Sequence, residues 1–258
     1  PDRRASRKRA TALAGRRAHQ SGFGRVAIHA GALSADDAES ITAGVAAGAW
    51  DLKEFQTPPP AEARRPPHAE ADIAGAGSAA EPGITRGIAI AEGLALARRL
   101  AMLPGNVCTP DYLADTARDI GNRHGLRITV LGRAEMEREG MGSFLSVAQG
   151  TPQEPRLITL EYRQGGDAAP VALVGKGLCF DSGGISIKPA QGMEHMKFDM
   201  CGAAGVLGAM EAIARLGLAV NVVGLVGSTT NMPSGTAVKP GDVVRASNGK
   251  FIEIINTD

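Results

Sequence analysis

The sequence is poor in the residues from which several classes of protein are built. Aromatic residues make up 3% of its 258 positions, which does not fit an aromatic-rich β-sandwich. Its three cysteines, Cys108, Cys179 and Cys201, form no CxxC pair, so neither a disulfide framework nor a thiolate zinc site is indicated. No apolar run approaches the roughly 20 residues that span a bilayer, and the first residues lack the apolar core of a signal peptide. We therefore expect a cytoplasmic protein with reduced cysteines and no membrane partner.

An excess of charge of one sign is also missing. The chain has 28 Lys and Arg against 27 Asp and Glu, and the net charge of +1 gives no global argument for a nucleic-acid or membrane partner. The one strong charge run is the first twenty residues, where Arg and Lys are frequent and a single Asp opposes them. We interpret this run as the solvated face of a helix, with phosphate binding as the alternative.

Hydrophobic residues, by contrast, make up 43% of the chain, and 34 positions are glycine. This composition supplies a core for one large or two modest domains. The predicted organisation is a partial α/β N-terminal domain at residues 1–56, a Pro/Ala/Gly-rich linker at 57–83, and a second domain at 84–258. Prolines gather in the linker and predict that it has no regular structure. Because the chain opens on Pro1 and stops directly after a strand-like segment, we expect it to be part of a longer protein.

Apolar stretches of strand length alternate with helical patterns. Strands are predicted at residues 23–31, 126–131, 156–162, 171–175 and 219–228, and helices at 34–50, 84–103, 109–125 and 203–217. Ser34 and Thr109 stand where two of these helices need an N-cap. Strands that are apolar throughout and alternate with helices predict an α/β fold, with a mixed, largely parallel sheet flanked by helices. Ligands of such sheets bind beyond the carboxyl ends of the strands.

The segment VALVGKGLCFDSGGISIKP, residues 171–189, places a glycine-rich turn at one of these strand ends. A phosphate-binding loop is not indicated, because GKG here lacks the upstream spacing and the hydroxyl of GxxxxGK[ST]. The dinucleotide motif GxGxxG fails because Phe180 holds its last glycine position. Serine catalysis is not indicated either, since DSG is not GxSxG.

Three acids, Asp181, Asp199 and Asp258, each follow a hydrophobic segment near a predicted strand end. Burial of a carboxylate there costs several kcal/mol unless positive charge compensates it. Divalent cations supply that charge, and carboxylate oxygens are the ligands that magnesium, manganese and zinc accept. Each Asp taken alone is explained as well by the capping of a turn. The three acids together with Lys176 and Lys188 favour a metal site.

The segment VGKGLCFDSGGISIKPAQGMEHMKFDMCGAAGVLGAM and the final NTD resemble the leucyl (cytosol) aminopeptidase family, the M17 dimetal metallopeptidases. The match includes spacing, because the motif residues stand 5, 7, 11 and 59 positions apart, in the order Lys176, Asp181, Lys188, Asp199 and Asp258. The resemblance extends upstream to residues 97–117 and 140–150, and more weakly to the segment before the linker. It implies that residues 84–258 are the N-terminal part of a metallopeptidase catalytic domain, truncated at Asp258.

The resemblance implies a metal-ligand set of Lys176, Asp181, Asp199 and Asp258. Asp181 would bridge two divalent ions, Lys176 would bind one ion, Asp199 would bind the first and Asp258 would bind the second. The ions would be manganese or zinc, with magnesium or cobalt as alternatives. A ligating Lys176 must be neutral, which requires its pKa to fall from about 10.4 to below 7, a cost of roughly 5 kcal/mol. Burial and a neighbouring cation are the expected causes of that shift.

Two further residues take roles by resemblance. Lys188 would be catalytic, its ammonium facing the scissile carbonyl and offsetting oxyanion charge in the transition state. Met196 would line the pocket for the first side chain of the substrate, and a core methionine is the alternative interpretation.

The reaction implied by the resemblance is release of N-terminal, leucine-type residues from peptides by water that two metal ions activate. The full-length protein is expected to be a homo-hexamer. The family's motif continues past Asp258 with a bridging glutamate and an arginine, so we expect the 258-residue piece alone to be inactive. Two other functions stay open: a catalytically inactive peptide-binding relative, and a DNA-binding relative that would use the basic run with Arg3, Arg4, Arg7 and Arg9.

Overall fold

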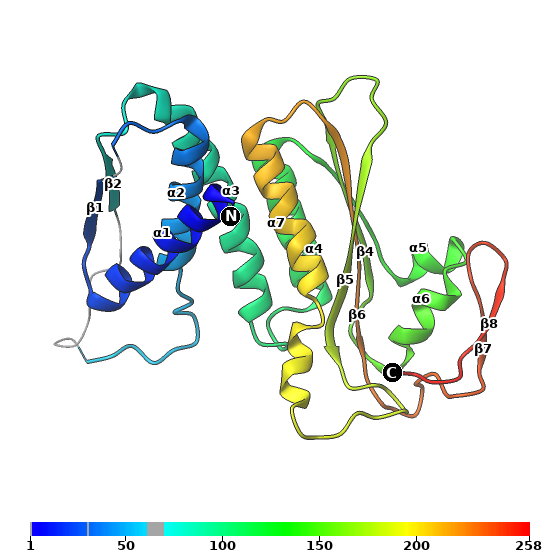
Figure 1. Cartoon of the computed structure of the whole chain (residues 1–258). Coiled ribbons are helices and arrows are strands. Elements are labelled where there is room, and N and C mark those ends of the chain that lie inside the picture. The colour runs from blue at the N-terminus through cyan, green and yellow to red at the C-terminus, as the bar shows by residue number, and fades with distance from the viewer. Residues whose placement is uncertain (1, 30, 61–69) are drawn as a thin grey trace. The chain divides into compact units, whose positions relative to one another are not determined.

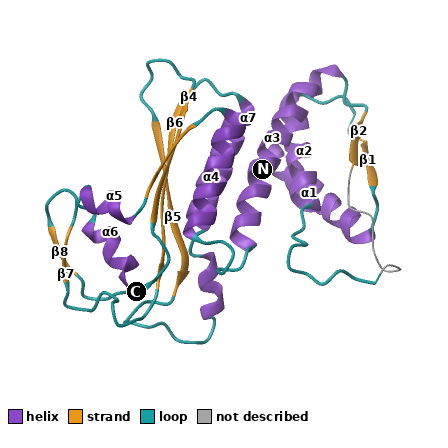
Figure 2. Cartoon of the chain, turned by 180° about the vertical axis from the view of Figure 1, so that it is seen from behind, coloured by secondary structure: helices purple, strands orange, loops and turns teal. Residues whose placement is uncertain are grey.

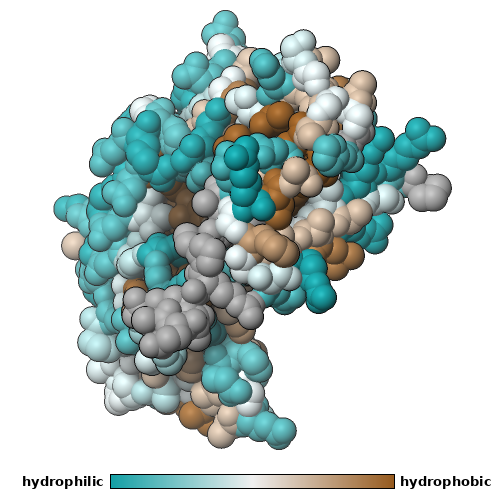
Figure 3. Space-filling view, turned by 90° about the vertical axis from the view of Figure 1, so that its left-hand side faces the viewer, coloured by the Kyte–Doolittle hydropathy of each residue, from teal (hydrophilic) through white to brown (hydrophobic). Residues whose placement is uncertain are grey.

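A computed structural model describes residues 2–29, 31–60 and 70–258 of the chain. It divides into two compact units, Pro1–Ala95 and Leu96–Asp258. The helices and strands of both units are labelled in Figure 1, and Figure 2 shows them from behind. No described helix is both long enough and apolar enough to cross a membrane. The face shown in Figure 3 is mostly hydrophilic, with smaller hydrophobic patches.

The described residues of the first unit form helices and a two-stranded parallel sheet. Their bounds are α1 Arg3–Ser21, β1 Arg25–His29, α2 Ala35–Ala49 and β2 Glu70–Ala74, followed by a 3-10 turn, η2, at Ser78–Ala80 and the start of α3, Glu81–Met102. Ser34 is the N-cap of α2, as predicted, and its side chain accepts a hydrogen bond from the Asp37 amide. A small core forms around α2, from Leu33, Ala38, Ile41, Val45, Ala76 and Ala80.

The structure differs from the sequence prediction in the linker. Residues 61–69 lie outside the described residues, but β2 forms at Glu70–Ala74 and pairs with β1. The two units divide inside α3, between Ala95 and Leu96, rather than within the proline-rich segment. Prolines break helices and central strands. They do not exclude a short strand beyond the last of the clustered prolines.

The second unit is a four-stranded sheet with helices on both faces. Its helices after α3 are α4 Pro110–His124, α5 Arg133–Arg138, α6 Gly142–Val147 and α7 Cys201–Leu216, with 3-10 turns η3 Ala148–Gly150 and η4 Met193–Phe198. Its strands are β3 Arg127–Leu131, β4 Arg156–Arg163, β5 Val171–Asp181 and β6 Asn221–Asn231, and a separate hairpin joins β7 Val243–Arg245 to β8 Phe251–Glu253. Thr109 is the N-cap of α4, which confirms the capping expected there.

The strand order of this sheet is β3-β4-β6-β5. The predicted α/β class with a mixed sheet is confirmed. The expectation of a largely parallel sheet is corrected, because among the described strands of this sheet only β5 and β6 pair in parallel. The residues between β4 and β5, 164–170, are too few for the crossover that two parallel strands of one sheet need, so β4 and β5 run in opposite directions on either side of β6. Helix α7 provides that crossover between β5 and β6.

The main core lies between the sheet and two helices. Figure 1 shows α4 and α7 on one face of the sheet, and α5 and α6 on the other. Fully buried side chains fill the α4/α7 side, among them Leu100, Leu113, Ile120, Ile158, Leu160, Leu207 and Met210. On the opposite face Gly227 of β6 makes room for the ring of Phe144 on α6, since a Cβ at this position would lie 2.7 Å from Phe144 Cε2.

Candidate functional site

Strand β5 carries the first two predicted site residues. A strand alternates its side chains between two faces, so Lys176 and Asp181, five positions apart, would ordinarily face opposite sides. The pairing of β5 with β6 is irregular between Leu178 and Asp181, where three steps along β5 match two steps along β6. Such a bulge moves the following side chain to the other face. Both Lys176 and Asp181 therefore line the same cavity.

The glycine-rich turn after β5 brings Lys188 back toward Asp181. Gly183 and Gly184 have φ angles of 86° and 68°, a region that favours glycine. The backbone amide of Lys188 donates to the Ser182 carbonyl at 3.0 Å and closes the loop. Lys188 Nζ then lies 3.3 Å from Asp181 Oδ2.

The last residues of the chain meet the same loop. Thr257 Oγ1 donates to the Gly183 carbonyl at 2.7 Å and accepts from the Ser186 amide at 2.8 Å. This contact places Asp258 beside the loop, where its Oδ1 forms an ion pair with Lys188 Nζ. Three of the predicted site residues, Asp181, Lys188 and Asp258, are thus gathered in one cluster.

Asp199 forms a second pair, with Lys176. It lies in the turn between η4 and α7, and Lys176 Nζ is 2.8 Å from Asp199 Oδ2. That oxygen has almost no exposed surface, and no donor among the described residues reaches it with hydrogen-bonding geometry. The approach of α7 to β5 depends on glycine, because a Cβ on Gly175 would lie 2.4 Å from the carbonyl oxygen of Gly202.

Asn231, at the end of β6, is a site residue that the sequence analysis missed. It is 5% exposed, and its Nδ2 donates to Asp181 Oδ1 at 2.9 Å and to the Thr257 carbonyl at 2.8 Å. It therefore links β5 to the terminal segment. A signal for it exists in the sequence: the predicted strand at 219–228 continues as a polar TTN sequence, and parallel strands bring their carboxyl ends to one edge.

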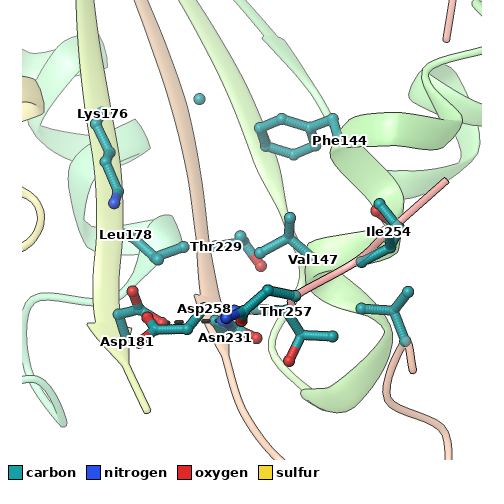
Figure 4. A pocket seen from close by; sticks show the side chains of 14 residues that line it. Phe144, Val147, Lys176, Leu178, Asp181, Thr229, Asn231, Ile254, Thr257 and Asp258 are labelled. Atoms are coloured by element: carbon teal, nitrogen blue, oxygen red, sulfur yellow. Dashed lines mark hydrogen bonds between the residues drawn. The ribbon is translucent and has the colours of Figure 1, made fainter. Parts of the chain in front are cut away.

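A cavity of about 360 Å³ opens beside these residues. Figure 4 shows Lys176, Asp181 and Asp258 reaching it from the strands and the terminal segment. Its remaining wall is largely apolar and includes Phe144, Val147, Leu178, Val238 and Ile254. Met196, on η4, does not line this cavity, and its proposed role as a pocket residue stays a prediction.

The side chains in this region offer the oxygen donors that a divalent cation requires. Within the described residues, no three His, Cys, Asp or Glu side chains converge into a metal-binding group on their own. The carboxylates instead fall into two sets, each facing a lysine: Asp199 with Lys176, and Asp181 and Asp258 with Lys188. Oxygen donors of this type fit hard divalent cations. Asp199 Oδ2, which is buried and accepts no hydrogen bond from the described residues, has the Lys176 ammonium as its cationic neighbour at 2.8 Å.

One expectation about a side chain near the site is corrected, and a second stays a prediction. Lys176 was expected to be buried, but 62% of its side chain is exposed within these 258 residues. No cysteine was expected to be a metal ligand. That stays a prediction; desolvation, and then the charge of Asp199, raise the pKa of the Cys201 thiol.

The basic run at the start of the chain forms helix α1, as expected of a solvated helix face. Two of its arginines are ion-paired with the neighbouring helix: Arg4 with Asp36 and Arg7 with Asp37. These ion pairs neutralise positive charge of Arg4 and Arg7 that would otherwise be available to bind nucleic-acid phosphates. The described part of the chain provides no observation that favours a DNA-binding function.

Fold and site together define an α/β protein with a carboxylate-rich and lysine-containing site at the carboxyl ends of parallel strands. The sequence profile of the cytosol aminopeptidase family, catalytic domain, matches residues 95–258. The chain belongs to this family, as the motif spacing predicts.

Relatives and solved structures agree with this assignment. The chain is 59% identical over 179 residues to a probable cytosol aminopeptidase of Aromatoleum aromaticum, and 55% identical over 181 residues to one of Cupriavidus pinatubonensis. These matches cover 69% and 70% of the chain but only 36% of each relative, so the chain spans about a third of their length.

Two solved structures are similar over nearly the whole chain. The bottromycin maturation enzyme BotP in complex with Mn has a TM-score of 0.86 and 32% identity, covering 98% of this chain and 54% of that one. A mutant of tomato leucine aminopeptidase has a TM-score of 0.86 and 31% identity, covering all of this chain and 51% of that one.

Proposed function

We propose that the protein carrying this chain is a metal-dependent aminopeptidase that releases leucine-type N-terminal residues from peptides. The observation that carries the proposal is the gathering of Lys176, Asp181, Lys188 and Asp258 around one strand end, with Asp199 paired to Lys176. Membership of the cytosol aminopeptidase family supports the reaction class. The length of the relatives supports the further proposal that residues 84–258 are the first part of a longer catalytic domain.

Four residues would hold two divalent ions: Lys176, Asp181, Asp199 and Asp258. The manganese in the BotP structure supports manganese, and zinc, magnesium and cobalt are alternatives. When bound, such ions supply Lewis-acid activation of water and of the scissile carbonyl, and a site for the free amine of the substrate. That amine requirement restricts cleavage to the N-terminal bond.

The chain's own residues supply orientation and charge. Asp181 Oδ1 is held by Asn231 and by the Gly183 amide, so Oδ2 would be the oxygen available to a cation. Lys188 would place its ammonium against the carbonyl oxygen, where negative charge develops in the transition state. Met196 would contact the first side chain of the substrate. A hexameric assembly and a cytoplasmic location are further parts of the proposal, and the word cytosol in the relatives' names supports the second.

The test compares two substrates that differ only at the amine. A protein of the relatives' length that carries this chain should release leucine from L-leucine amide in the presence of Mn²⁺, and should leave N-acetyl-L-leucine amide intact. EDTA should abolish the activity and Mn²⁺ should restore it. The 258-residue chain alone should be inactive. Cleavage of the acetylated substrate at a comparable rate, or activity insensitive to chelation, would refute the proposal.

A further inference from the structure

We infer that Lys188 stands in for a divalent cation while the site holds no metal: its ammonium keeps Asp181 and Asp258 together, and it must leave before a cation binds both carboxylates. The inference rests on the proposed function, because it assumes that these two residues are metal ligands. It assigns Lys188 a role in metal loading, in addition to the role toward the substrate.

The contacts of Lys188 are those that a bridging cation would make. Its Nζ lies 3.3 Å from Asp181 Oδ2 and forms an ion pair with Asp258 Oδ1. The other oxygen of Asp181 is already satisfied, since Oδ1 accepts from Asn231 Nδ2 at 2.9 Å and from the Gly183 amide at 3.0 Å. The ammonium therefore occupies the one oxygen of Asp181 that is left for a cation.

Asp181 is buried, Lys188 is partly buried and Asp258 is more exposed, so the contact is only partly screened by water. The side chains of Asp181, Lys188 and Asp258 are 8%, 20% and 32% exposed. Two carboxylates at close range repel each other, most where one of them is buried as Asp181 is, and an intervening cation removes that repulsion. Asp181 is on β5 and Asp258 is in the terminal segment, so Lys188 also helps to join two parts of the chain that are far apart in sequence.

The backbone of Lys188 is fixed by its loop, whereas its side chain is held only by the two carboxylates. Its backbone amide is bound to the Ser182 carbonyl at 3.0 Å, and the same loop is held to Thr257 through Ser186. The loop is thus anchored at several points, while the long lysine side chain is held at its Nζ by the two carboxylates. Displacement by a metal then needs only a change of side-chain rotamer. It also frees the ammonium from the two carboxylates, so that Lys188 becomes available for its proposed role toward the substrate.

Replacing Lys188 by methionine separates this idea from simple charge repulsion. Methionine keeps much of the length and the apolar body of the side chain and removes the charge. If Lys188 holds the carboxylates together, the metal-free Lys188→Met variant should unfold about 2–4 °C below the wild type. It should also bind Mn²⁺ about tenfold more tightly, because no ammonium has to be displaced. If Lys188 only repelled the metal from a distance, affinity would rise and the metal-free unfolding temperature would stay unchanged.

The experiment uses chelator-treated protein, thermal unfolding with and without metal, and calorimetric titration with MnCl₂. Lys239→Met is the matched control, because Lys239 forms an exposed ion pair with Asp242, outside the site. It should change neither the Mn²⁺ affinity nor the gain in unfolding temperature on metal binding. Unchanged or weaker Mn²⁺ affinity in Lys188→Met, or an unchanged metal-free unfolding temperature, overturns the inference. A wild-type protein of the relatives' length that binds no Mn²⁺ would instead overturn the proposed function.

Discussion

Asn231 donates a hydrogen bond from Nδ2 to Asp181 Oδ1 at 2.9 Å, which joins the carboxyl ends of the parallel strands β5 and β6. The same amide group donates to the Thr257 carbonyl at 2.8 Å. One buried side chain therefore orients a proposed metal ligand and also holds the segment that carries Asp258. Groups that orient metal ligands without touching the metal commonly affect affinity by one to two orders of magnitude.

Replacing Asn231 by alanine should weaken Mn²⁺ binding about tenfold to a hundredfold, because Asp181 loses the donor that fixes its orientation. Asn221→Ala is the matched control. Asn221 is similarly buried at the other end of β6, where its Nδ2 donates to the carbonyls of Gly166 and Ala168. Both variants should lower the free energy of unfolding by about 1–3 kcal/mol. Calorimetric titration should separate them, and equal Mn²⁺ affinity in the two variants would count against a positioning role for Asn231.

The contact between β5 and α7 predicts a contrast between two glycines. Gly175→Ala would bring a Cβ within 2.4 Å of the Gly202 carbonyl oxygen, so the strand and the helix must separate. This should destabilise the protein by about 1–3 kcal/mol and weaken the pairing of Lys176 with Asp199. A Cβ on Gly205, in α7, would have no described atom beyond its own helix and chain neighbours within 4 Å. Gly205→Ala should stabilise the helix by about 0.5–1 kcal/mol. Denaturant unfolding of both variants should show a lower free energy of unfolding for Gly175→Ala and a higher one for Gly205→Ala.

If Lys176 is a metal ligand, a substitution that keeps its positive charge should still reduce the amount of bound metal. Lys176→Arg keeps the positive charge, but a guanidinium stays protonated and has no lone pair for a metal. The variant should bind one equivalent of Mn²⁺ fewer than the wild type. Lys197→Arg is the control, since Lys197 Nζ donates to the Met102 carbonyl. Equal metal stoichiometry in Lys176→Arg and the wild type, measured by elemental analysis, would remove Lys176 from the ligand set.

Local features of the fold were predictable because they depend on neighbouring residues. Ser34 and Thr109 cap α2 and α4 as their positions indicate, since an N-cap needs only a short polar side chain before an apolar periodic run. Strand directions were harder to predict. Apolar strands are typical of parallel sheets, and this pattern led to the prediction of a largely parallel sheet. The connection between β4 and β5 is too short for a parallel crossover, and its length was the signal that the chain reverses there.

The motif predicted only the site residues that belong to it, and gave no information on how strand pairing and distant residues arrange them. The bulge between Leu178 and Asp181, which directs both Lys176 and Asp181 into one cavity, depends on pairing with β6 and has no signal within β5 itself. Asn231 was missed because its partner is far away in sequence. The exposure of Lys176 was also not predictable, since an apolar strand at the edge of a sheet presents some of its side chains to solvent.

Glu211 of α7 gives a prediction about pH that is independent of the metal site. Its side chain is 3% exposed, and Oε1 accepts from Arg123 at 2.6 Å, from Arg215 at 2.5 Å and from His124 at 3.1 Å. Burial raises the pKa of Glu211, but hydrogen bonds from Arg123, Arg215 and His124 outweigh it and lower the pKa to about 2. Arg123 and His124 belong to α4, so this carboxylate joins the two helices that cover one face of the sheet.

The sign of the pH dependence follows from that lowered pKa. In the unfolded chain Glu211 takes up a proton near its ordinary pKa of about 4.3, whereas in the folded chain it does so only near pH 2. Its contribution to stability is therefore fully present above pH 4.5 or so and is lost as the pH falls toward 2, with a slope of up to about 1.4 kcal/mol per pH unit. Glu211→Gln should lower the free energy of unfolding by about 2 kcal/mol at pH 7. It should also remove this slope, so that the free energies of unfolding of the variant and the wild type converge near pH 2.

The exposed Glu137 is the control, and Glu137→Gln should leave the pH profile of urea unfolding unchanged. A parallel offset between Glu211→Gln and the wild type at every pH would show that Glu211 stabilises α4 and α7 by packing rather than by its charge.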